Sequence, residues 1–135
     1  MPEIKGIFLF CDDVREETGG KASLIGLLGN EATVETLPGL LSKLAAVFLC
    51  TVHGADRVKA HLTLEVIGVE DLEVRIFEVE RDFERPSNSS EEWSLRINLV
   101  GPVPVAQGSK VRATCRIGDF STASTLLISQ VPRTE

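Results

Sequence analysis

The sequence lacks the clusters of basic and aromatic residues that bind nucleic acids and the long apolar runs that cross membranes. It contains no tyrosine, one tryptophan and six phenylalanines, and its 14 Lys and Arg residues are scattered among 20 Asp and Glu residues, which gives a net charge of −6. Phosphate-binding surfaces need clustered basic side chains and base-stacking platforms need aromatic ones, so we expect no nucleic-acid partner. No apolar run approaches the roughly 18 residues of a membrane span, so we expect no membrane partner.

Cysteine is also scarce, and its arrangement excludes a disulfide scaffold. Cys11, Cys50 and Cys115 are widely separated in apolar stretches, and Cys-x-x-Cys spacing is absent. An odd number of buried free thiols is typical of proteins in a reducing compartment. The N-terminal residues lack the pattern of a signal peptide. We therefore predict a cytoplasmic protein.

What the sequence does contain is apolar and polar alternation with period 2. Residues 58–67, 93–99 and 111–117 each alternate in this way, which predicts strands with one face on a core and the other face largely in water. In all, we predict strands over residues 4–11, 21–28, 31–36, 44–53, 58–68, 73–80, 93–99, 111–117 and 122–131. About nine short strands at this spacing predict a single all-β domain over residues 1–135, an antiparallel β-sandwich of the immunoglobulin-like or a related kind.

Glycine, proline and serine divide these strands. The segment 37–44 opens with Pro38 and Gly39 and contains several leucines, so we expect at most one short helical turn there. Clear breaks fall at residues 16–20, 85–90 and 101–108. Gly118 and Asp119 predict a two-residue hairpin turn, because glycine readily takes the positive φ of such turns.

The densest polar cluster follows the first predicted strand. It places four carboxylates within residues 12–17 and is followed by Gly19, Gly20 and Lys21. The candidate site residues in this corner are Asp12, Asp13, Arg15, Glu16 and Lys21. Carboxylates on a flexible loop could gather around a divalent cation, although the spacing matches no calcium loop. The other interpretation is a structural or interaction corner in which opposite charges pair across the first hairpin.

A second constellation arises if residues 44–53 and 58–68 form a hairpin. That register places Cys50 opposite His61, the minimum pair for a thiol nucleophile. No acid or amide is placed to orient His61, and a side chain in the middle of a strand reaches a substrate poorly. We therefore interpret the pair as packing, and predict that the protein is not an enzyme and needs no cofactor.

The opening of the chain resembles a family of small bacterial proteins of unknown function. The resemblance is carried by the stretch FLFCDDVREETGGKASLIG, residues 8–26, with Pro38 and then LAAVFL, residues 44–49, downstream. It implies an all-β chain and supplies no activity. The family-like positions are Asp12, Arg15, Glu16, Gly20, Lys21 and Gly26, and a structural corner would explain all of them.

Together these features predict a non-enzymatic binding or scaffold module with an unknown protein partner. The candidate surfaces are the tip at residues 84–92 and the corner at residues 12–21. Self-association through sheet edges, giving a homo-oligomer, is a secondary expectation. The alternative is a binding domain that depends on a divalent cation held by the acidic loop at residues 12–17.

Overall fold

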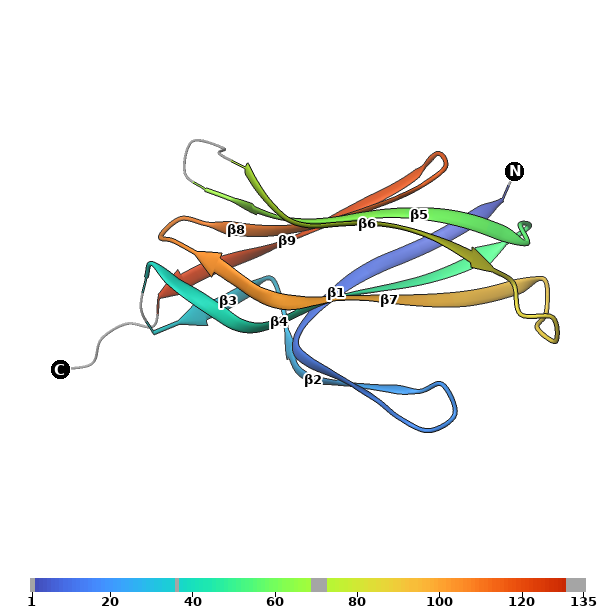
Figure 1. Cartoon of the computed structure of the whole chain (residues 1–135), viewed down its shortest axis with the longest axis horizontal. Coiled ribbons are helices and arrows are strands. Elements are labelled where there is room, and N and C mark those ends of the chain that lie inside the picture. The colour runs from blue at the N-terminus through green and yellow to red at the C-terminus, as the bar shows by residue number, and fades with distance from the viewer. Residues whose placement is uncertain (1, 36, 69–72, 131–135) are drawn as a thin grey trace.

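The computed structural model describes residues 2–35, 37–68 and 73–130, and within them the chain forms nine strands and no helix (Figure 1). The strands are β1 (Glu3–Glu16), β2 (Ala22–Leu28), β3 (Glu31–Val34), β4 (Gly39–His53), β5 (Arg57–Ile67), β6 (Glu73–Glu84), β7 (Glu92–Val105), β8 (Lys110–Ile117) and β9 (Phe120–Gln130). They build a four-stranded sheet, in the order β2-β1-β4-β7, and a five-stranded sheet, in the order β3-β9-β8-β5-β6. The two sheets pack face to face, which confirms the predicted all-β sandwich.

Strand pairing is antiparallel with one exception. β3 runs parallel to the end of β9, with Glu31 opposite Leu127 and Val34 opposite Gln130. The five-stranded sheet is therefore mixed rather than purely antiparallel. This pairing places β3 beside one end of β9 only, and β8 covers the opposite side of β9 along the whole segment from Phe120 to Leu127.

The core lies between the sheets and follows the alternation of the sequence. Along β5, Ala60, Leu62 and Leu64 are fully buried, and the same alternation buries one face of β7 and of β8. Phe48 lies at the centre of the four-stranded sheet, with its ring centroid 5.0 Å from that of Phe8. Trp93 is also buried and donates a hydrogen bond of 2.8 Å from Nε1 to the carbonyl of Ala55. The period-2 pattern thus identified the inward faces correctly.

The prediction that the outer face of β5 lies largely in water is less accurate. Thr63 and Glu65 point away from the core, yet each is only 5% exposed. β5 lies between β6 and β8, and Arg112 of β8 forms an ion pair of 3.6 Å with Glu65. Alternation identifies the face on which a side chain lies, but neighbouring strands decide how much of that face water reaches.

Several strands are longer than predicted, and three of them extend through segments that were expected to be loops, turns or breaks. β1 continues through the expected acidic loop to Glu16, because β2 pairs with it as far as Glu16 opposite Ala22. No helical turn forms within the described part of residues 37–44, where at most one was expected, because β4 begins at Gly39, which pairs with Val105 of β7. β7 continues through Pro102 and Pro104, where a break was expected. Proline is tolerated there because β7 is an edge strand, with one side free of ladder hydrogen bonds.

The other predicted breaks are confirmed, with turns between β1 and β2 and between β6 and β7. Gly118 has φ of 57° and lies in the tight turn that sets Ile117 opposite Phe120, as the hairpin prediction required. The predicted ends of two strands, Thr36 and Val131, lie outside the described residues. The part of the chain that the structure describes holds no helix with the length and apolar character needed to cross a membrane.

The predicted hairpin between residues 44–53 and 58–68 is wrong. β4 and β5 belong to different sheets, so the connection after His53 crosses the sandwich instead of turning back within one sheet. Cys50 is opposite Gly6 of β1 and Leu95 of β7, whereas His61 is opposite Arg116 of β8. The alternation shows which face of each strand is buried but carries no information about which strands are neighbours. The predicted Cys50–His61 pair therefore does not form.

Candidate functional site

The acidic corner of the sequence lies on a hairpin that leaves the sandwich. We call residues 12–28 the arm, which consists of the second half of β1, the turn after it and β2. Figure 1 shows the arm below the four-stranded sheet, with its tip turned back beneath that sheet. The first half of β1 pairs with β4, from Glu3 opposite His53 to Cys11 opposite Ala45, so the arm begins where this pairing ends.

The arm bends at Asp12 and Gly26. Gly26 has φ of 68°, a left-handed conformation that favours glycine. A β-carbon on Gly26 would lie 2.7 Å from Cγ of Asp12 and closer still to Oδ2. The ladder between β1 and β2 is regular on both sides of this point, with Cys11 opposite Leu27 and Asp13 opposite Ile25. The bend therefore needs a glycine, and the side chain of Asp12 fills the space that the glycine leaves.

The arm is held against the outer surface of the four-stranded sheet by a small apolar cluster. Cys11, Ala45 and Val47 are fully buried although they point away from the main core. Val14 and Leu24 of the arm pack on them. Apolar burial of this kind stabilises a contact by about 25 cal/mol per Å² removed from water. The cluster explains why three residues on the outer surface of a sheet have no contact with water.

An ion pair joins the arm to the far edge of the sheet. Glu16 of β1 contacts Arg96 of β7 and accepts a hydrogen bond of 3.4 Å from Nδ2 of Asn98. At the tip, the amide of Glu17 donates a hydrogen bond of 2.8 Å to the carbonyl of Lys21, and Ser23 donates to the carboxylate of Glu17. These contacts close the turn and tie its base to β7.

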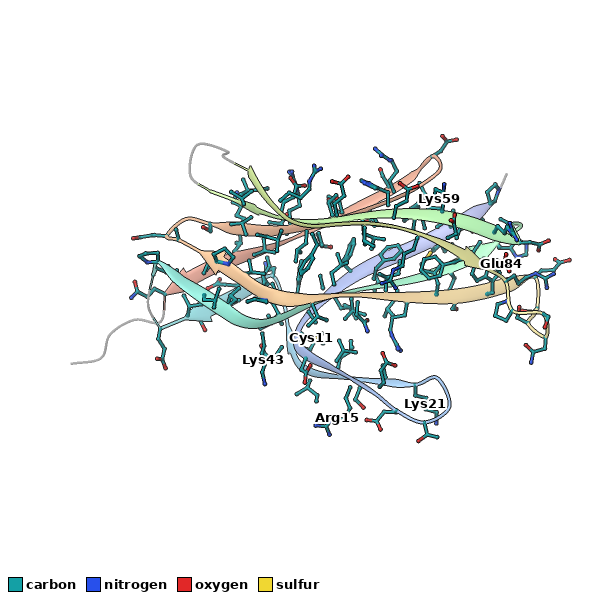
Figure 2. All side chains as sticks on the ribbon, viewed as in Figure 1. Cys11, Arg15, Lys21, Lys43, Lys59 and Glu84 are labelled. Atoms are coloured by element: carbon teal, nitrogen blue, oxygen red, sulfur yellow. The ribbon has the colours of Figure 1, made fainter. Side chains whose placement is uncertain are left out.

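The opposite side of the arm is open and borders a depression of about 820 Å³. We call its lining the arm-side surface: Asp12, Asp13, Arg15, Ile25, Val34, Glu35, Gly39, Leu40, Leu41 and Lys43. Ile25 is 39% exposed and Leu40 is 58% exposed. Figure 2 shows Arg15 on the arm and Lys43 on β4 projecting from the same side of the sheet. The surface thus combines exposed apolar side chains with charges of both signs.

The structure divides the five predicted site residues among three places. Asp12, Asp13 and Arg15 line the arm-side surface. Glu16 faces the sheet and pairs with Arg96, and Lys21 lies exposed at the tip of the arm (Figure 2). The expected pairing of an aspartate with Arg15 or Lys21 is replaced by this contact with β7, and Asp13 instead accepts a hydrogen bond of 2.9 Å from the amide of Val14.

The predicted acidic loop is an extended strand, which separates its carboxylates. Side chains of a strand alternate between two faces, so Asp13 and Glu16 point to opposite sides of the arm. Within residues 2–35, 37–68 and 73–130, no group of three or more His, Cys, Asp or Glu side chains is placed to hold a metal ion. Carboxylates that point to opposite faces of one strand converge poorly on one ion.

The three thiols lie in surroundings that suppress their reactivity. Cys11, Cys50 and Cys115 are free and buried. Burial raises the pKa of Cys50 to about 11 and that of Cys115 to about 12, and it also raises the pKa of Cys11. Since the thiolate is the reactive form, these thiols are poor nucleophiles at neutral pH.

His61 lies on the outer face of the five-stranded sheet, away from the thiols. Its Nε2 is 2.8 Å from Oε1 of Glu78, whose other oxygen accepts a hydrogen bond from Arg75. Two hydrogen bonds lower the pKa of the Glu78 carboxyl group, and the one from His61 has a larger effect than the one from Arg75. The imidazole is thus part of a surface charge network rather than of a catalytic pair.

Sequence reasoning missed Ile25, Leu40 and Lys43. Ile25 lies on the same face of the hairpin as Arg15. The alternation of β2 could have shown this if the pairing of residues had been extended from the break at residues 16–20. Leu40 and Lys43 fell in the segment interpreted as a helical turn, so their position beside the arm could not be inferred. Their placement depends on the pairing of β4 with β1 and with β7, which are long-range contacts.

The fold and the arm define a small two-sheet β-sandwich with a hairpin hooked beneath one sheet. The chain belongs to a family of unknown function (DUF6941), whose family model matches residues 6–119. This range includes the arm and every strand from β2 to β8. The predicted membership in an uncharacterised family is thereby confirmed. No curated protein matches the chain.

Proposed function

We propose that this protein is a non-enzymatic module that binds a protein partner through the arm-side surface. The observation that supports the proposal is the presence of Ile25 and Leu40, both exposed, in one depression with Asp13, Arg15 and Lys43. Protein interfaces typically combine an apolar centre, which contributes most of the affinity, with a polar rim. Exposed apolar groups framed by charge are the usual mark of such a surface.

The chemistry of the surface specifies what kind of partner it fits. Ile25 and Leu40 gain most from covering by apolar side chains, at about 25 cal/mol per Å². Arg15 and Lys43 favour acidic groups on the partner, and Asp12, Asp13 and Glu35 favour basic ones. We therefore propose a partner segment with apolar side chains at its centre and charges of both signs around them.

A rigid platform supports this use of the surface. The arm is fixed by the buried cluster around Val47 and by the contact between Glu16 and Arg96. A preformed surface loses less conformational entropy on binding than a flexible one.

The three buried free thiols support a reducing compartment, and we propose a cytoplasmic location on that basis.

The test is site-specific cross-linking in the cells that produce the protein. A photo-reactive amino acid replaces Leu40 in one variant and Val74, on β6 of the other sheet, in the matched control. The two side chains are 58% and 57% exposed. The proposal expects a defined protein adduct from position 40 and none of the same mass from position 74. No adduct from position 40, or the same adduct from both positions, would contradict it.

A cation-dependent form of this binding is tested in the same experiment. Permeabilised cells are irradiated with and without EDTA. The proposal expects the adduct at position 40 in both samples. Loss of the adduct in EDTA would instead support a divalent cation held by the acidic residues at 12–17.

A further inference from the structure

The first half of β9 has an unpaired side. β8 pairs with one side of Phe120–Leu126, whereas on the other side β3 pairs only with the end of β9, from Leu127 onward. Within the described residues, no strand pairs with the outer side of Phe120–Leu126. β1, in the other sheet, runs close to β9 without joining it. We call Phe120–Leu126 the β9 edge.

The β9 edge lacks the features that protect the β6 and β7 edges of the sandwich. Proteins block exposed strand edges with charged side chains, prolines or bulges, because an open edge can pair with another chain. β6, the opposite edge of the same sheet, is densely charged, and β7 carries Pro102 and Pro104. β9 contains no charged residue and no proline from end to end. The sequence of β9 therefore holds none of these blocks against pairing with another strand.

Two hydrogen bonds show to which side the backbone groups of the β9 edge point. The amide of Leu127 donates a hydrogen bond of 2.8 Å to the carbonyl of Asn30, on the side toward β3. The amide of Ile128 points the other way, toward Ser109. Hydrogen-bonding groups of a strand alternate sides residue by residue. The amide and carbonyl groups of Ser121, Ala123 and Thr125 therefore point outward from the unpaired edge.

The side chains of the β9 edge form a palindrome of residue classes. Reading outward from Ala123, hydroxyl residues follow on both sides and an apolar residue closes each end, in the order Phe120, Ser121, Thr122, Ala123, Ser124, Thr125 and Leu126. A two-fold axis through Ala123 would place each residue opposite one of its own class. An isologous interface requires this self-complementarity, since each residue meets its symmetry counterpart.

We propose that the β9 edge pairs with the β9 edge of a second copy of this chain, antiparallel, around a two-fold axis at Ala123. In this register Ala123 exchanges backbone hydrogen bonds with Ala123 of the second copy. Ser121 does so with Thr125 of the second copy, and the reverse pair forms by symmetry. These are the residues whose amide and carbonyl groups point outward, so this register pairs the backbone groups that are free to bond. The five-stranded sheets of the two copies join into one continuous sheet.

The side chains in this register are compatible on both faces. On the inner face Phe120 lies opposite Leu126 of the second copy, and Thr122 lies opposite Ser124. Cross-strand pairs of like apolar or hydroxyl residues stabilise a sheet, and no like charges meet. The proposal is separate from the arm-side surface, because none of the residues in the β9 edge lines it.

The test uses charge at Ala123, which is exposed in the single chain. Ala123→Lys and Ala123→Glu each place two like charges at the two-fold axis, and Val74→Lys on β6 is the matched control. Oligomeric state is measured by analytical ultracentrifugation up to about 0.5 mM, a range that detects even millimolar dissociation constants. Circular dichroism confirms that each variant retains the sheet.

The proposal expects the natural chain and Val74→Lys to dimerise as concentration rises. Each Ala123 variant alone should be monomeric over the same range. An equimolar mixture of Ala123→Lys and Ala123→Glu should recover the dimer, because opposite charges now meet at the axis. A natural chain that stays monomeric at the highest concentration would overturn the proposal. So would a dimer that persists unchanged in Ala123→Lys alone.

Discussion

The side chain of Asp12 occupies the space that a β-carbon on Gly26 would need. This close approach fixes the point at which the arm leaves the sandwich and bends beneath the four-stranded sheet. Further along the arm, toward its tip, Val14 and Leu24 pack on the outer surface of that sheet instead of entering the main core. The contact therefore determines where the arm-side surface forms.

Replacing Gly26 with alanine should destabilise the protein strongly. The left-handed φ costs about 1–2 kcal/mol for a residue with a β-carbon, and the overlap with Asp12 adds about 1–3 kcal/mol. Gly19→Ala is the matched control, because Gly19 also has positive φ but open space around it. Urea denaturation should show a much larger loss for Gly26→Ala. Equal losses would mean that the contact with Asp12 is unimportant.

The contact between Glu16 and Arg96 should restrain the arm more than it stabilises the fold. Both groups are partly exposed, so Glu16→Ala should lower the free energy of unfolding by less than about 1 kcal/mol. Amide hydrogens of β2 should nevertheless exchange several-fold faster. Glu17→Ala is the control, since Glu17 bonds within the hairpin and not to β7. Similar exchange rates in both variants would show that the ion pair does not hold the arm.

The buried thiols should be inert until the protein unfolds. With the pKa of Cys50 about 11 and that of Cys115 about 12, little thiolate exists at neutral pH. Iodoacetamide at pH 7.5 should label neither residue in the native protein and should label both in urea. Rapid labelling of native Cys50 would contradict this description of its surroundings and reopen a catalytic role.

The same pKa values make stability sensitive to alkaline pH. A thiol whose pKa is raised by folding contributes stability that is fully present below its unfolded pKa, near 9, and is lost as pH rises toward 11–12. The urea concentration at the unfolding midpoint should therefore decrease as the pH is raised from 8 to 10.5. The Cys50→Ala, Cys115→Ala double variant should lose less over this interval. An equal loss would assign the alkaline sensitivity to other groups.

The sequence predicted local structure well and long-range pairing poorly. Alternation identified the buried faces of β5, β7 and β8, and Gly118 marked a tight turn correctly. The alternation could not show that β4 and β5 lie in different sheets, because a strand has the same pattern whichever neighbour it pairs with. The predicted Cys50–His61 pair was wrong for this reason.

The candidate site was predicted in part. Asp12, Asp13 and Arg15 do lie together on one surface, but Glu16 faces the other way because residues 12–16 are a strand and not a loop. Leu40 and Lys43 join that surface because β4 pairs with β1 as far as Cys11 opposite Ala45, where the arm begins, and with β7 beyond that point. No local pattern could have revealed a neighbour set by so distant a contact.

Affinity capture with three forms of the protein tests the proposed function most directly. The tagged natural chain, Leu40→Asp and Val74→Asp are each incubated with a native lysate, and retained proteins are quantified by mass spectrometry. The arm-side surface predicts a stoichiometric partner that the natural chain and Val74→Asp retain and Leu40→Asp loses. A partner that all three forms retain equally, or a natural chain that retains none, would contradict it.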